Sequence, residues 1–200
     1  MKRIINKVLS VFLVLSILFS FSMFAFATDT NNNVITKDSE YYLTPEEIMN
    51  GDYFPTEEIE KVVESGAVIL GGIDAPMSEL IDESSGSRLI TGQVWCRSYA
   101  TYDEDEGVSV HIELYVPWWY FANPKFNGMS GTVNVNLERP YYKTFVAVAN
   151  EADTIDTDVD TKATAPSGTE GTVNIVGIAI GTNIASGAGE FASSYEITIP

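Results

Sequence analysis

The chain has 200 residues, of which 45% are apolar, and its 28 acids against 11 Lys and Arg give a net charge of −17. This length and composition fit a globular domain with a sizeable core. The charge argues against nucleic acid as a partner, because phosphates are bound by Lys and Arg. It favours solubility and cation binding instead.

Residues 1–27 have the pattern of a secretory signal peptide. Three basic residues precede an apolar run over residues 8–24, and Ala25 and Ala27 supply the small residues that signal peptidase needs. An uncleaved anchor is the alternative, since the run approaches the shortest length that spans a bilayer. Its serines and the cleavage site favour removal. We therefore expect a secreted, extracellular protein without an integral membrane segment after cleavage.

Residues 28–87 form an acidic segment that we expect to be partly helical. Thr44 is followed by Pro45 and by Glu47, which together make a capping box for a short helix that ends at Asn50. A second helix is predicted from after Thr56 to Ser65, with apolar residues at helical spacing and glycine in the C-cap position. The acids of these helices are interpreted as a solvated face, and a docking helix or pro-segment is the alternative.

Residues 88–200 switch to the alternating pattern of strands with one buried and one wet face. Polar turns such as Asp103 to Gly107, Asn127-Gly128 and Pro166 to Gly168 separate the strands. This pattern predicts a mainly β fold, an antiparallel immunoglobulin-like sandwich of about seven strands, with a jelly roll or barrel as alternatives. The expected strands are 89–101, 107–116, 131–138, 141–149, 153–164, 172–181 and 190–199.

The chain has one cysteine, Cys96, and one histidine, His111. Cys96 is interpreted as a small buried residue of a strand, because free cysteine is among the most buried residue types. His111 shares a strand face with Ser109 and Glu113, and we interpret it as a surface residue on the wet face. A Cys-His nucleophilic pair is the alternative, because the first hairpin could bring the two residues together.

Asp156, Asp158 and Asp160 alternate along one strand, so their carboxylates project from one face about 7 Å apart. Such a row either binds a hard cation such as calcium or remains a solvated edge protected from aggregation by its charge. An EF-hand is excluded, because Thr161 and Ser167 stand where that loop needs glycine and glutamate.

The densest aromatic stretch runs from Tyr115 to Phe121 and contains Trp118, Trp119 and Tyr120. It either closes one end of the sandwich or forms an exposed platform that stacks on sugars. No catalytic residues are predicted, although paired carboxylates of a hydrolase cannot be recognised in so acidic a chain. The sequence favours a secreted, non-catalytic protein that binds an extracellular protein or glycan. A carbohydrate-binding module is the first alternative and a hydrolase the second.

Overall fold

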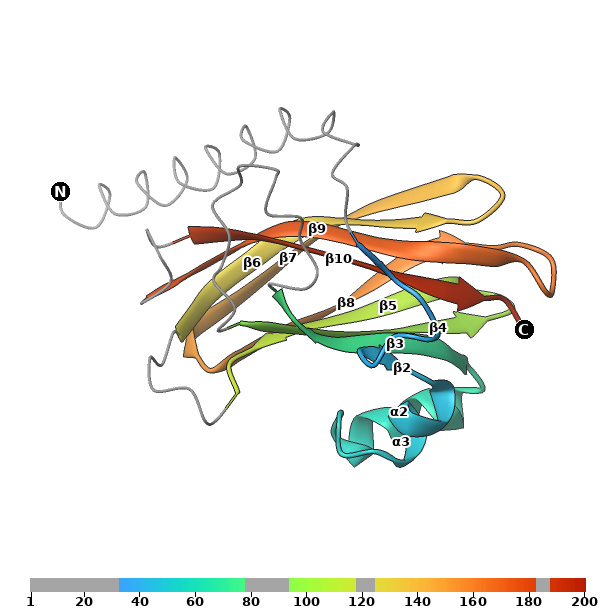
Figure 1. Ribbon diagram of the computed structural model, residues 1–200, viewed down its shortest axis with the longest axis horizontal. Helices are drawn as coiled ribbons and strands as arrows, with labels where there is room; N and C mark the ends of the chain where they lie inside the picture. The colour runs from blue at the N-terminus through green and yellow to red at the C-terminus, as the bar shows by residue number, and fades with distance from the viewer. Residues whose placement is uncertain (1–32, 78–93, 118–124, 183–187) are drawn as a thin grey trace, which may run out of the picture. The chain divides into compact units, whose positions relative to one another are not determined.

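Two β-sheets lie face to face in the computed structural model, and two short helices lie beside one of them (Figure 1). The structure describes residues 33–77, 94–117, 125–182 and 188–200. The predicted signal peptide, the boundary between residues 87 and 88, and Trp118 and Trp119 therefore lie outside the described residues. Among the described residues, no helix is long and apolar enough to cross a membrane.

The first sheet has the order β1-β10-β9-β6-β7 and the second the order β2-β3-β4-β5-β8. Neighbouring strands are antiparallel, except that β1 pairs in parallel with β10. The strands of the first sheet are β1 (Val34–Ile35), β6 (Lys125–Asn136), β7 (Pro140–Ala152), β9 (Glu170–Thr182) and β10 (Ala188–Thr198). Those of the second are β2 (Tyr42–Leu43), β3 (Val68–Pro76), β4 (Trp95–Asp103), β5 (Gly107–Tyr115) and β8 (Thr154–Ala163).

The mainly β prediction is confirmed, but the immunoglobulin-like sandwich of seven strands is not, since the described residues form two five-stranded sheets. The additional strands β1, β2 and β3 come from the acidic N-terminal segment. β3 pairs along its length with β4, and its run Val68 to Ile73 lacks the polar alternation of a half-exposed strand. Asn127-Gly128 lies at an irregularity inside β6 rather than in a turn, so this strand begins earlier than expected.

Both predicted helices are confirmed, as α2 (Pro45–Asn50) and α3 (Thr56–Ser65). Thr44 and Glu47 form the reciprocal capping box of α2, which satisfies backbone groups that the helix start would otherwise leave unpaired. Gly66 ends α3 in the left-handed conformation, with a φ of 87° that side chains rarely adopt.

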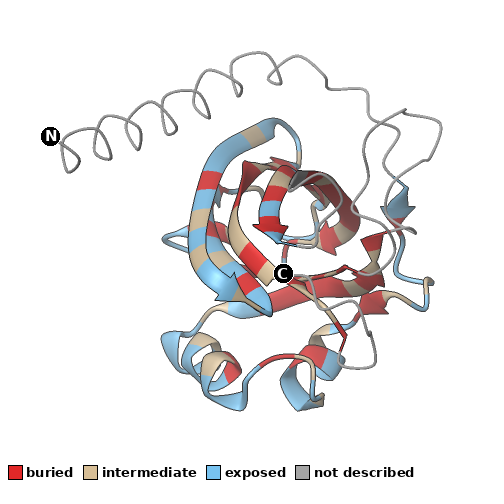
Figure 2. Cartoon of the chain, turned by 90° about the vertical axis from the view of Figure 1, so that its left-hand side faces the viewer, coloured by how far each residue is buried: buried red, intermediate tan, exposed pale blue. Residues whose placement is uncertain are grey.

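The main core lies between the two sheets, where side chains such as Ile112, Ile175 and Tyr195 are fully buried. Buried residues concentrate on the central strands, whereas the helices carry many exposed ones (Figure 2). A second, smaller cluster lies between the helical segment and the outer face of the second sheet. It consists of Leu43, Ile48, Phe54, Ile59, Ile69 and Tyr99.

Candidate interaction surface and covered polar cluster

The outer face of the first sheet is assembled from alternating residues of β6, β7 and β9. The register places Thr144, Thr132 and Val176 in one row across these strands. The next row, two residues along each strand, has Val146, Ser130 and Ile178. Because side chains alternate between the two faces of a strand, both rows project away from the core.

Over residues 128–136 of β6, 142–150 of β7 and 172–180 of β9, none of the even-numbered positions carries a charge, whereas Glu170 of β9 and Glu190 of β10, which opposes Ile178, lie at the margin. We call this surface the uncharged face. It consists of the even-numbered residues of three segments: 128–136 of β6, 142–150 of β7 and 172–180 of β9. Val146 is 67% exposed, Val148 84% and Tyr142 59%. Exposed apolar side chains that adjoin on one surface mark a contact surface or an aggregation hazard. Its lack of charge stands out in a chain with a net charge of −17.

One end of the uncharged face is polar. Tyr142, Asn134, Asn174 and Ser194 lie in one row across β7, β6, β9 and β10. Ser194 Oγ donates to Asn174 Oδ1 at 2.7 Å, and Asn174 Nδ2 is 3.1 Å from Thr172 Oγ1. Asn134 Oδ1 is buried and has no hydrogen-bond partner in the structure. Amide and hydroxyl groups therefore border the apolar part of the face.

His111 occupies a different environment from the one that the sequence suggested, since it is 5% exposed. Its Nδ1 lies 2.9 Å from Asp158 Oδ1 and 3.3 Å from Glu58 Oε1. The ring stacks on Tyr99 at 5.0 Å and meets the edge of Phe54 at 5.7 Å. The interpretation as a surface residue was wrong, because the N-terminal segment brings Phe54 and α3 over this face of the second sheet.

The charges around His111 set its protonation. Burial of the ring lowers the pKa of His111, but the hydrogen bond with Asp158 and the charges of Glu58, Asp158 and Glu113 outweigh burial, so the pKa lies above its usual value. The same hydrogen bond holds the pKa of Asp158 below its usual range. Tyr99 Oη donates to Glu58 Oε1 at 2.6 Å and completes the link between α3 and the sheet.

Arg97 lies beside this cluster on β4 and is largely covered. Its guanidinium is 3.3 Å from Asp74 and 3.9 Å from Glu113, lies 4.4 Å from the Tyr115 ring centroid, and donates to the backbone carbonyl of Tyr53. Burial raises the pKa of Glu113 despite the opposing charge of Arg97. Asp74 and Glu113 are both engaged by Arg97. They are suited to holding the sheet and the helical segment together.

Cys96 is buried in the main core, as the sequence predicted. Burial raises the pKa of its thiol to about 12, and Sγ lies 3.9 Å from Ser193 Oγ. Cys96 opposes Leu114 on β5, whereas His111 opposes Tyr99. The two residues therefore project from opposite faces of the second sheet, and a Cys-His pair is excluded.

The aspartates of β8 lie on the outer face of the second sheet, opposite Glu113, His111 and Ser109 of β5. Asp158 bonds to His111, and Asp160 lies 2.8 Å from the Lys162 ammonium. No group of three or more His, Cys, Asp or Glu side chains in the described parts of the chain is arranged to hold a metal ion. Calcium binding by Asp156, Asp158 and Asp160 thus remains a sequence-based prediction.

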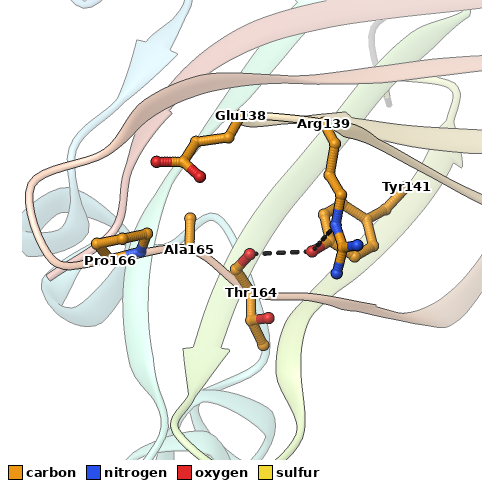
Figure 3. A pocket seen from close by; sticks show the side chains of 6 residues that line it. All are labelled: Glu138, Arg139, Tyr141, Thr164, Ala165 and Pro166. Atoms are coloured by element: carbon orange, nitrogen blue, oxygen red, sulfur yellow. Dashed lines mark hydrogen bonds between the residues drawn. The ribbon is translucent and has the colours of Figure 1, made fainter.

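A pocket of about 600 Å³ lies between the β6–β7 turn and the loop after β8 (Figure 3). Arg139 Nε donates to Tyr141 Oη at 2.8 Å, and Tyr141 Oη donates to the carbonyl of Thr164 at 3.1 Å (Figure 3). The hydrogen bond from Arg139 lowers the pKa of Tyr141. Glu138 is the one acid among the lining residues, so the pocket does not supply a carboxylate pair.

The sequence-predicted platform Trp118, Trp119 and Tyr120 lies outside the described residues, so the structure does not place it. The uncharged face was missed, although the sequence carries a signal for it. Even-numbered residues from Tyr142 to Asn150 include no charge, and the same holds from Thr172 to Ile180. Only the strand register shows that these runs adjoin on one surface.

Comparison with protein-family models, with curated proteins and with solved structures finds no match. The function is therefore inferred from the residues and their arrangement.

Proposed function

We propose that this chain is a secreted, non-catalytic interaction protein that contacts an uncharged extracellular partner through the uncharged face. The signal-peptide pattern of residues 1–27 supports export. The observation that carries the proposal is the charge-free surface of β6, β7 and β9, on which Val146 and Val148 are 67% and 84% exposed. Burying this apolar surface against a partner would be favourable at about 25 cal/mol per Å².

The charge distribution supports an uncharged partner. An anionic surface would be repelled by a chain with a net charge of −17. A strongly cationic partner would instead be attracted to the acidic parts, such as the outer side of β8. An electrically neutral partner that contacts only the uncharged face leaves the flanking carboxylates of Glu170 and Glu190 hydrated.

A neutral glycan is the partner that the polar end of the face favours. Tyr142 presents a half-exposed ring, and the half-buried Asn134 and Asn174 lie in the same row, where Asn174 is hydrogen bonded to Ser194 and Thr172. Sugar recognition combines ring stacking with hydrogen bonds to hydroxyls, and this row offers both.

The proposal is tested by placing one charge on the uncharged face. Val176 is 42% exposed on β9, so Val176→Lys should fold normally and yet weaken binding to insoluble neutral polysaccharides or isolated cell walls. Val68→Lys is the matched control, because Val68 is 46% exposed on the other sheet. Equal binding by both variants in a pull-down would rule out the uncharged face as the contact surface.

A further inference from the structure

The helical segment, residues 44–66 with α2 and α3, packs on the second sheet separately from the main core. Its backbone hydrogen bonds lie within the segment itself, in the two helices and their caps. Its buried side chains Ile48, Phe54 and Ile59 belong to the smaller cluster on the outer face of that sheet. A unit that buries few apolar side chains and makes its backbone hydrogen bonds internally can open locally while the rest of the chain stays folded.

Glu58 connects α3 to the polar groups of the second sheet. Tyr99 Oη of β4 donates to Glu58 Oε1 at 2.6 Å, and the same oxygen lies 3.3 Å from His111 Nδ1 of β5. Asp158 Oδ1 of β8 lies 2.9 Å from that nitrogen. One ring nitrogen therefore holds two carboxylates, one from the helical segment and one from the sheet.

The charge of His111 determines whether these carboxylates hold α3 down or repel it. A protonated ring compensates both Glu58 and Asp158. A neutral ring has one N–H, which cannot satisfy both carboxylates, so Glu58 then faces Asp158 as a like charge. Glu113 of β5 adds a third negative charge near the ring. Loss of the proton therefore turns an attraction between α3 and the sheet into a repulsion.

The other polar attachments of the segment do not change with pH. Arg97 of β4 donates to the backbone carbonyl of Tyr53 and stays charged over the whole accessible range. Burial raises the pKa of Tyr99, so its hydroxyl stays protonated and continues to donate to Glu58. His111 is thus the group whose titration near neutral pH changes the attachment of α3.

We propose that the helical segment is a pH-sensitive strap, which is closed on the second sheet while His111 carries a proton and opens when that proton is lost. Because the pKa of His111 is raised above 6.5, the closed form has its full stabilisation below pH 6.5 and loses it as the pH rises through the raised pKa. Opening would remove Phe54 from the rings of Tyr99 and His111 and leave the main core intact. The strap lies on the second sheet and the uncharged face on the first, so opening can be tested without a ligand.

Hydrogen exchange followed by mass spectrometry measures this opening. Protection factors, which correct for the intrinsic exchange rate at each pH, are compared at about pH 5.5 and pH 8.5, on either side of the titration of His111. Peptides from residues 44–66 should lose protection about 5- to 30-fold towards alkaline pH, whereas peptides from β9 should keep theirs. Unchanged protection of the segment would overturn the proposal. An equal loss in β9 would also overturn it, because the whole fold would then open together.

Three variants separate the role of His111 from that of charge in general. His111→Gln keeps Glu113 and should abolish the pH step in residues 44–66. Glu58→Gln can still accept from Tyr99 and removes the like charge beside Asp158, so its segment should stay protected at alkaline pH.

Glu57→Gln is the matched control, since Glu57 is an exposed acid in the same turn of α3 and its replacement changes the net charge equally. This variant should keep the full step. The same loss of the step in Glu57→Gln and Glu58→Gln would attribute it to general charge and refute the strap. If Glu58→Gln loosens the segment at both pH values, His111→Gln decides, because a full step in that variant would exclude His111 as its origin.

Discussion

Replacing His111 by Gln should remove a pH-dependent part of the stability of this protein. His111 Nδ1 bonds to Asp158 at 2.9 Å and lies 3.3 Å from Glu58, and Glu113 and Tyr99 also face the ring. Because the pKa of His111 is raised above its ordinary value of 6.5, the folded state holds the proton more tightly than the unfolded state. The stabilisation is thus complete below pH 6.5 and is lost as the pH rises through the raised pKa.

The size of this effect follows from the exposure of the partners. A hydrogen bond to a charged group contributes about 1.5–3 kcal/mol, whereas exposed ion pairs contribute about 0.2–1 kcal/mol. The side chain of Asp158 is 82% exposed and that of Glu58 is 32% exposed, so water and salt screen part of the interaction. We therefore expect the contribution of His111 to the free energy of unfolding to fall by about 1–2 kcal/mol from acidic to alkaline pH.

Urea unfolding of the unmodified protein and of His111→Gln, followed by circular dichroism at a series of pH values, measures this contribution. The difference in the free energy of unfolding between the two proteins should be largest near pH 5.5 and shrink on the alkaline side. Burial also raises the pKa of Glu113 above its ordinary value of 4.5, so this carboxyl adds its own pH dependence on the side above pH 4.5. A difference that is constant with pH, or that grows as the pH rises, would refute this account of the cluster.

Three further predictions follow from the core and from β8. The Cys96 thiol should resist thiol reagents in the folded protein and react quickly in denaturant, because it is buried and its pKa is about 12; rapid labelling of the native state would contradict this. Gly177→Ala should lower the free energy of unfolding by about 1–3 kcal/mol, because the added Cβ would lie 2.6 Å from Phe191 Cζ and 2.6 Å from a backbone oxygen. An unchanged urea midpoint would show that the core rearranges to accommodate the added methyl group. Millimolar calcium should leave the melting temperature unchanged, since Asp158 and Asp160 are engaged by His111 and Lys162. A rise that disappears when the three β8 aspartates become Asn would support the calcium site instead.

Local patterns predicted much of the secondary structure. The capping box of Thr44 and Glu47 and the C-cap at Gly66 located both helices, because these signals act within one helical turn. The alternation over residues 107–116 located β5 for a similar reason. β3 was missed, because a run of buried residues such as Ile69 to Ile73 has no period that distinguishes strand from other buried structure.

The site residues depended on contacts between distant segments. His111 has the polar neighbours of a wet strand face, yet Phe54 and Glu58, more than fifty positions earlier in the sequence, cover it. The alternation gave its strand face correctly. It could not show that another segment packs on that face, because such packing depends on long-range contacts.

The sequence by itself determined the strong acidity, the signal-peptide pattern and most strand and helix positions, since these depend on composition and on short-range geometry. Only the tertiary structure decided that β6, β7 and β9 adjoin and that β7 is a sheet edge. Strand order and register are set by the burial of the core across the whole sheet. The uncharged face is therefore a property of the folded chain, although every residue in it can be read from the sequence.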